Sequence, residues 1–199
     1  MADGCFTARR LHLGVAKKDL KHLKKFMNFV NSKNTITKTV GCTKTIHYRL
    51  TITCVKVITE LRKKFNISNR KTYEPCDIKS IKNPELLFSL IVGFLDGDGC
   101  VSKRPTNCYS ISFVGHMNWL DNFCFMKAFV YNYFNHEDTT MKLKIIKKYT
   151  TLPQDKTKTK KLYYGTGFNI NKIALIKAIK TKAKELNLPF LKRKLGKVH

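Results

Sequence analysis

The segment from Asn83 to Cys100 constrains the fold most strongly, because it joins a long apolar helix to an acidic end. Asn83 is suited to cap this helix and Pro84 to begin it, and the apolar run continues to Asp96. Small residues recur at every fourth position of the run, at Ser89, Gly93 and Gly97. Because residues four apart share one face of a helix, we expect a second backbone to pack directly against this face.

An acidic residue, Asp98, follows the helix at its partly negative end, which is a suitable place for a hard divalent cation. The Asp-Gly-Asp-Gly sequence alone would be ordinary turn chemistry. The longer run from Leu90 to Gly99 combines an apolar stretch, an internal glycine and a terminal acid. It resembles the signature helix of the LAGLIDADG homing endonucleases, with Gly93 at the internal glycine and Asp98 at the catalytic acid.

The net charge favours a polyanionic partner. The chain has 39 Lys and Arg residues against 13 Asp and Glu residues, which gives a net charge of +26 over 199 residues. No stretch approaches the roughly 20 apolar residues that are needed to span a bilayer. Basic residues are also spread along the whole chain, so DNA or RNA is a better candidate partner than a membrane.

Seven cysteines occur without a Cys-x-x-Cys pair or zinc-finger spacing. An odd number of cysteines and no signal peptide indicate a reducing compartment. The abundance of Lys, Asn, Ile, Phe and Tyr is typical of an AT-rich coding sequence. We therefore expect an organelle-encoded protein, such as one from a mitochondrion.

The chain contains the same unit twice. Residues 1–8 align with residues 96–103, so that Asp3 corresponds to Asp98 and both are followed by Gly-Cys. The pattern of apolar residues predicts the same elements after each match. Strands are expected at 10–17, 35–40 and 45–54 and again at 109–114, 141–149 and 162–170; helices are expected at 19–30 and 55–65 and again at 118–134 and 171–186. The first of these helices should have one apolar face, and the second should bury Val57, Ile58, Leu61 and Phe65.

This order predicts an α+β fold with two pseudo-symmetric αββαββα units, at residues 1–78 and 79–199. Longer offsets late in the repeat indicate an insertion in the second unit, at 151–161. Helices can cover only one face of each antiparallel sheet, which leaves the other face for a partner. Cationic strand residues are predicted to bind DNA on these faces: His47, Arg49, Lys142, Lys144 and Lys148.

The resemblance implies the chemistry. Two-repeat members of the family pack two signature helices side by side and place one acid from each beside the scissile phosphates. By this resemblance Asp3 and Asp98 are paired catalytic metal ligands, with Gly97 beside them, and Mg²⁺ or Mn²⁺ is the cofactor. Two neighbouring carboxylates require such cations to stay ionised together.

The family also places a basic residue near each phosphate, after the last helix of each repeat. Lys71 and Lys194 occupy those positions here, where they would stabilise the transition state or polarise water. Polar residues at the end of the second strand of each unit line the same pocket in the family. Lys17 and His116 match these by their distance from the helix caps predicted at Asp19 and Asn118.

One departure from the family concerns the first signature helix, which should precede Asp3 although the chain begins at Met1. Three explanations are open. The preferred one is that the true start lies upstream, which predicts a monomer. The others are a degenerate remnant, or a homodimer that pairs through the Ser89, Gly93 and Gly97 face and brings together two Asp98 residues.

The primary hypothesis is therefore an intron-encoded, metal-dependent endonuclease that makes site-specific double-strand breaks in DNA. The alternative is an intron RNA maturase or a catalytically inactive nucleic-acid-binding remnant, which would keep the basic sheets without the chemistry. A small basic ribosomal protein would explain the charge but not the signature helix.

Overall fold

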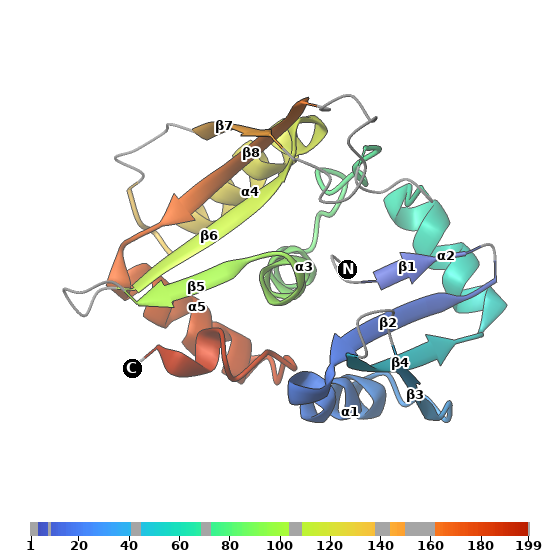
Figure 1. The fold of residues 1–199 in the computed structure, drawn as a ribbon. Helices are drawn as coiled ribbons and strands as arrows, with labels where there is room; N and C mark the ends of the chain where they lie inside the picture. Colours follow the sequence, from blue (N-terminus) through green and yellow to red (C-terminus); the bar gives the residue numbers. More distant parts are fainter. Residues whose placement is uncertain are drawn as a thin grey trace.

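The chain forms two four-stranded antiparallel sheets, each covered by helices on one face (Figure 1). This computed structural model describes residues 4–7, 9–40, 45–68, 73–103, 109–137, 144–149 and 162–198, and of 144–149 and 162–165 it describes the backbone only. In Figure 1 the two sheets lie on opposite sides of the helix α3 (Pro84–Gly97). None of the helices in these ranges has the length and apolarity that crossing a membrane requires.

The two units repeat one topology. The first contains β1 (Gly4–Phe6), β2 (Leu11–Ala16), α1 (Leu20–Phe29), β3 (Ile36–Val40), β4 (Ile46–Ile52) and α2 (Val55–Phe65). The second contains α3, β5 (Cys100–Lys103), β6 (Tyr109–His116), α4 (Leu120–Tyr133), β7 (Lys144–Tyr149), β8 (Leu162–Ile170) and α5 (Ile173–Glu185). The strand orders, β1-β2-β4-β3 and β5-β6-β8-β7, are equivalent, which confirms the predicted α+β class and its repeat.

Local capping chemistry was predicted correctly at one helix and wrongly at two. The Asn83 side chain accepts a hydrogen bond from the amide of Leu86 at 3.0 Å, as expected of an N-cap. Asp19 occupies the N-cap position of α1 but its side chain makes no cap bond, and the N-cap residue of α4 is Trp119 rather than Asn118. Asp19 and Asn118 both lie inside short 3-10 turns, at 17–19 and 117–119, that precede the helices and move their starts.

Four helices end in the same way. An asparagine in the left-handed region follows each of α1, α2, α4 and α5: Asn31 (φ 47°), Asn66 (φ 47°), Asn135 (φ 52°) and Asn187 (φ 50°). Asparagine tolerates this conformation better than other side chains with a Cβ, and it allows the chain to turn away. None of the described residues directly after α3 has a positive φ, and Asp98 has φ −97°.

The hydrophobic cores of the two units are unequal. The large core surrounds α3, with Phe88, Phe113 and Phe123 almost fully buried. The smaller core consists of Phe6, Leu11, Ile58 and Ile67. Phe65, at the end of α2, packs against both. The second unit is therefore the better packed, and Phe65 connects the two.

The apolar faces predicted for the first-unit helices are only partly covered. On α1 only Leu23 is buried, and Val30, just beyond the helix, is 37% exposed. On α2 Ile58 is buried as expected, but Val57 is 48% exposed, so its predicted burial is wrong. Among the described residues, the four buried side chains of the smaller core do not cover a second row of apolar side chains on α2.

Replacing Phe88 tests the larger core. Its side chain is fully buried and lies 5.7 Å and 5.8 Å, between ring centroids, from Tyr133 and Phe134. We expect Phe88→Ala to reduce the free energy of unfolding by about 3–5 kcal/mol, measured by urea denaturation, because it leaves a cavity. Phe29→Ala is the control, since Phe29 is 58% exposed and its loss should change this energy by less than about 0.5 kcal/mol. Equal losses in the two variants would contradict the assignment of the core.

Candidate functional site

Asp98 lies directly after the last turn of α3 and is exposed. Its amide and that of Gly99 both donate to the carbonyl of Phe94, at 3.0 Å and 3.2 Å. These bonds hold the backbone of Asp98 to the helix. Its predicted partner, Asp3, lies outside the described residues, so the pairing of the two acids stays a prediction.

Lys194 reaches the same end of α3 from the C-terminal segment. Its side chain is almost fully buried, with 5% of the residue exposed, and Nζ donates to three successive carbonyls. These belong to Leu95 at 2.8 Å, Asp96 at 2.5 Å and Gly97 at 3.1 Å. The structure thus places Lys194 beside the helix end that carries Asp98, but with its ammonium group bound to backbone oxygens.

Asp96 is the buried acid of the signature, and sequence analysis assigned it no role. It is 6% exposed, and its Oδ2 accepts a hydrogen bond from the amide of Leu191 at 3.0 Å. Its Oδ1 is buried without a hydrogen-bond partner among the described residues. Burial raises the pKa of Asp96 to about 6, against the lowering effect of the Leu191 amide and of the nearby Lys194 and Arg193 cations.

A histidine from the first unit faces this acid. His22 on α1 places Nε2 3.7 Å from Oδ2 of Asp96, a distance that would suit an ion pair. Burial lowers the pKa of His22, whereas burial raises that of Asp96 to about 6. Near pH 7 His22 is therefore mostly neutral and Asp96 is still mostly ionised, so the contact is a polar one between an imidazole and a carboxylate rather than a full ion pair.

Asp19 and Arg193 form a further contact of the first unit, this one with the C-terminal segment. Nε of Arg193 donates to both carboxylate oxygens of Asp19, at 2.9 Å and 3.1 Å. Asp19 is 9% exposed, and the Arg193 side chain is 41% exposed. The predicted helix cap at Asp19 is thus replaced by an ion pair with a residue distant in the sequence.

The open face of the first sheet is polar and cationic. Along β4, His47 and Arg49 are exposed and Thr51 is half-buried, whereas the intervening Leu50 is fully buried. The strand register aligns this row with Thr37 and Thr39 of β3 and with His12, Gly14 and Ala16 of β2. His12 and Thr51 hydrogen-bond at 3.0 Å. The structure therefore places His47 and Arg49 on an uncovered sheet face, as the alternation of residues indicates.

Sequence analysis matched Lys17 with His116, but in the structure this match is wrong by one residue. Both strands lead into 3-10 turns that begin at Lys17 and at Met117, so His116 corresponds to Ala16. Lys17 is exposed, whereas Nδ1 of His116 accepts from the amide of Asn118 at 3.3 Å. The ring of His116 also packs edge-on against Tyr73, with centroids 4.9 Å apart. The counting error arose because Asp19 and Asn118 do not have equivalent places in the two turns.

Several predicted residues receive only a partial description. In the second sheet, Lys144 pairs with Gly167 and Lys148 with Tyr163 across β7 and β8. Lys71, Lys142 and the predicted insertion at 151–161 lie outside the described residues. Their roles stay predictions.

The chemistry of the donors at the end of α3 suits a hard cation, because Asp98 offers an exposed carboxylate and Gly97 a carbonyl. The carbonyl of Gly97 already accepts from Lys194, although an oxygen of this kind has a second lone pair. No group of three or more His, Cys, Asp or Glu residues suited to a metal occurs in the described ranges. Asp98 is thus the described ligand that fits, and a complete site requires further donors.

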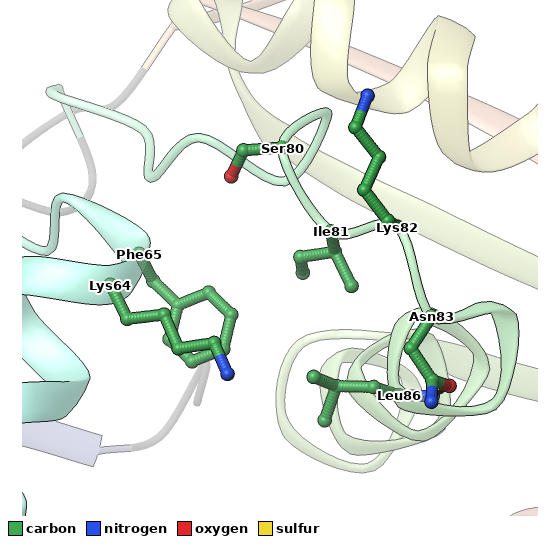
Figure 2. A pocket seen from close by; sticks show the side chains of 7 residues that line it. All are labelled: Lys64, Phe65, Ser80, Ile81, Lys82, Asn83 and Leu86. Atoms are coloured by element: carbon green, nitrogen blue, oxygen red, sulfur yellow. Dashed lines mark hydrogen bonds between the residues drawn. The ribbon is translucent and has the colours of Figure 1, made fainter.

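A separate pocket of about 290 Å³ lies at the other end of α3 (Figure 2). It is lined by Lys64, Phe65, Ser80, Ile81, Lys82, Asn83 and Leu86. In Figure 2 Lys82 points away from the apolar side chains. Nζ of Lys64 lies 5.9 Å from the centre of the Phe65 ring. None of these seven described residues carries a carboxylate, so the pocket is not the site of the acid chemistry expected at Asp98.

The pH dependence of stability tests the environment of His22. Its folded-state pKa lies below the ordinary value of 6.5, so its stabilising contribution is present above pH 6.5 and is lost as pH falls through the folded value. Compared with His22→Gln, the unmodified protein should therefore lose more unfolding free energy between pH 8 and pH 5, measured by urea denaturation. Asp96 titrates in both proteins, so its contribution cancels to first order. If the two proteins differed in unfolding free energy by the same amount at pH 8 and at pH 5, the lowered pKa of His22 would be contradicted.

The fold is similar to solved structures of one family. I-CpaMI, described as a LAGLIDADG meganuclease bound to uncleaved DNA, matches with 14% identity and a TM-score of 0.49 over 96% of this chain and 83% of that chain. I-SmaMI, a meganuclease bound to uncleavable DNA, matches with 13% identity and a TM-score of 0.49 over 98% and 83%. The N-terminal LAGLIDADG domain of WhiA matches with 12% identity and a TM-score of 0.45 over 91% and 74%.

No family model matches the sequence, and no curated protein matches it either. The identities and TM-scores of the structural matches are low, so the residues of this chain must support any functional proposal. In sequence and in fold, the chain resembles the LAGLIDADG proteins.

Proposed function

We propose that this protein is a metal-dependent endonuclease that makes site-specific double-strand breaks in DNA. The observation that supports it best is the position of Asp98, an exposed acid at the end of an apolar helix that lies between two sheets (Figure 1). A nuclease needs an acid at a fixed place relative to a surface that holds the duplex. The combination of α3 and the sheets offers this arrangement.

The open face of the first sheet supports DNA as the substrate. His47, Arg49 and the neighbouring threonines offer donors that suit phosphate oxygens and base edges. Antiparallel strands can enter the major groove, as two-stranded ribbons do. The net charge of +26 adds attraction to any nucleic acid but cannot distinguish DNA from RNA.

The residues of the chain contribute orientation and charge to phosphodiester hydrolysis. Asp98 would hold a divalent cation, Mg²⁺ or Mn²⁺, and a bound cation supplies activation of water and neutralises charge that develops on the phosphate. The backbone bonds to Phe94 fix the backbone of Asp98 relative to α3. Asp3, from the other unit, would provide the second acid, so that each acid serves one strand of the duplex.

The open face of α3 is the surface for a further helix. A Cβ built on Gly93 would have no atom within 4 Å, so this side of the helix is uncovered in the described part of the chain. In our proposal a helix that ends just before Asp3 covers it, and a second copy of the chain is the alternative. The genomic context we propose is an organelle intron, which would make the intronless insertion site the target.

Cleavage of that insertion site tests the proposal. We expect purified protein with Mg²⁺ to produce double-strand breaks and Asp98→Asn to reduce the rate at least about 100-fold, because it removes a metal ligand. Chelation of Mg²⁺ should stop the reaction. Sedimentation of the same preparation measures whether one or two copies act together.

The controls separate the nuclease from a binding protein. Asp121→Asn removes an exposed carboxylate on α4 and should leave cleavage unchanged. If neither the chain nor a form extended with an upstream helix cuts DNA, the nuclease proposal fails. Binding of intron RNA, or stimulation of its splicing, that survives Asp98→Asn would then favour the maturase alternative.

The salt dependence of binding tests the sheet face. Arg49→Ala should reduce the slope of log Kd against log salt concentration by about 0.9, the value expected for one lost phosphate contact. Fluorescence anisotropy with a labelled duplex measures this slope. Lys63→Ala is the matched control, because Lys63 is exposed on α2, which covers the opposite face of the same sheet. An equal change in both variants would place the DNA elsewhere.

A further inference from the structure

The carbonyl groups at the end of α3 have an unusual source of hydrogen bonds. The last four carbonyls of any helix lack partners within the helix. On α3 the first of them, that of Phe94, accepts from the amides of Asp98 and Gly99. The other three, those of Leu95, Asp96 and Gly97, all accept from Nζ of Lys194. One side chain, about 100 residues away in the sequence, therefore completes the end of this helix.

The geometry of Lys194 differs from that of a lysine available to a phosphate. Its ammonium group is buried, and it lies at the partly negative end of the helix dipole. A cation placed there stabilises the helix end electrostatically, and more strongly than it would in water because the site is buried. Its bonds are to backbone oxygens on both sides of Asp96, so they fix the last turn that leads to Asp98.

Residues near Lys194 attach the C-terminal segment to other parts of the protein. The amide of Leu191 donates to the side chain of Asp96. Arg193, which precedes Lys194, binds Asp19 in the first unit. Leu195 and Val198 are buried in the larger core and attach the segment to the second unit. Arg193 therefore binds the first unit and the next residue, Lys194, binds α3 of the second. Figure 1 shows the C-terminal segment between α1 and the second unit.

We propose that residues 191–198 form a clasp that sets the position of the end of α3 relative to the first unit. Lys194 and Arg193 are its positioning residues: Lys194 holds the last turn of α3, and Arg193 holds the clasp to Asp19. The clasp acts on Asp98 through the backbone and does not contact the DNA. Its role in catalysis rests on the proposed nuclease function, but its mechanical role does not.

Hydrogen exchange measures the mechanical role without DNA. The reporters are the amides of Asp98 and Gly99, which bond to Phe94 across the held turn. Lys194→Met should increase their exchange roughly tenfold or more, because three carbonyls lose their donor and the turn opens more often. The amides of Leu186 and Leu188 at the end of α5 should not change. Unchanged exchange at Asp98 and Gly99 in a folded variant would overturn the proposal.

A milder set of variants keeps the test decisive if Lys194→Met does not fold. Asp19→Asn, Arg193→Gln and the double variant should each raise exchange at Asp98 and Gly99 by a similar factor, because each breaks the same contact. Lys192→Gln, which removes an exposed charge from the same segment, is the matched control and should have no effect. Additive effects, or an equal effect of Lys192→Gln, would also overturn the clasp.

The cleavage assay separates positioning from DNA binding. Arg193→Gln should lower kcat about tenfold with KM within twofold, because the variant misplaces Asp98 and leaves the sheet faces intact. A raised KM with unchanged kcat would instead show that Arg193 contacts DNA, and would overturn its positioning role. If the unmodified protein does not cut DNA, the nuclease proposal fails, and the exchange experiments still decide whether the clasp exists.

Discussion

The binding of the Lys194 ammonium group by three carbonyls is the interaction on which the arrangement of the site depends. Burying a charged lysine is costly unless its hydrogen bonds are replaced. Here the negative end of a helix replaces them, so the cation and the unpaired carbonyls satisfy each other. Burial lowers the pKa of His22, and the Lys194 and Arg193 cations act in the same direction, whereas for Asp96 the same cations oppose the raising effect of burial.

The two units share a topology but differ in the size of their hydrophobic cores and in the surface they present. The second unit contains most of the buried aromatic side chains, including Phe94, whose ring packs against those of Trp119 and Phe123. The first unit has a small core and presents a polar sheet. We interpret the second unit as the scaffold that keeps α3 rigid, against which the first unit is aligned by Phe65 and by the clasp.

Much of the fold could be predicted from the sequence, because it depends on local patterns. The bounds of α2 and β8 agree with the prediction, and the alternation along β4 indicated which face is open. Asp19 was assigned wrongly, since a helix cap and an ion-pair partner require the same residue type. The clasp could not be found in this way, because its contacts join residues far apart in the chain and follow no period. Lys194 was placed near the right helix only through the resemblance, and its bonds were not foreseen.

The left-handed asparagines that end α1, α2, α4 and α5 have a consequence for how this protein can change over evolution. Those helix ends are encoded within a few residues, so each persists whatever happens elsewhere in the chain. The end of α3 depends instead on a distant side chain. A few substitutions in the C-terminal segment could therefore loosen the last turn of α3, and with it the position of Asp98. The core of the second unit and the polar face of the first sheet would remain. In the proposed nuclease, cleavage could therefore be lost by mutation while DNA binding is kept, without passing through an unfolded intermediate.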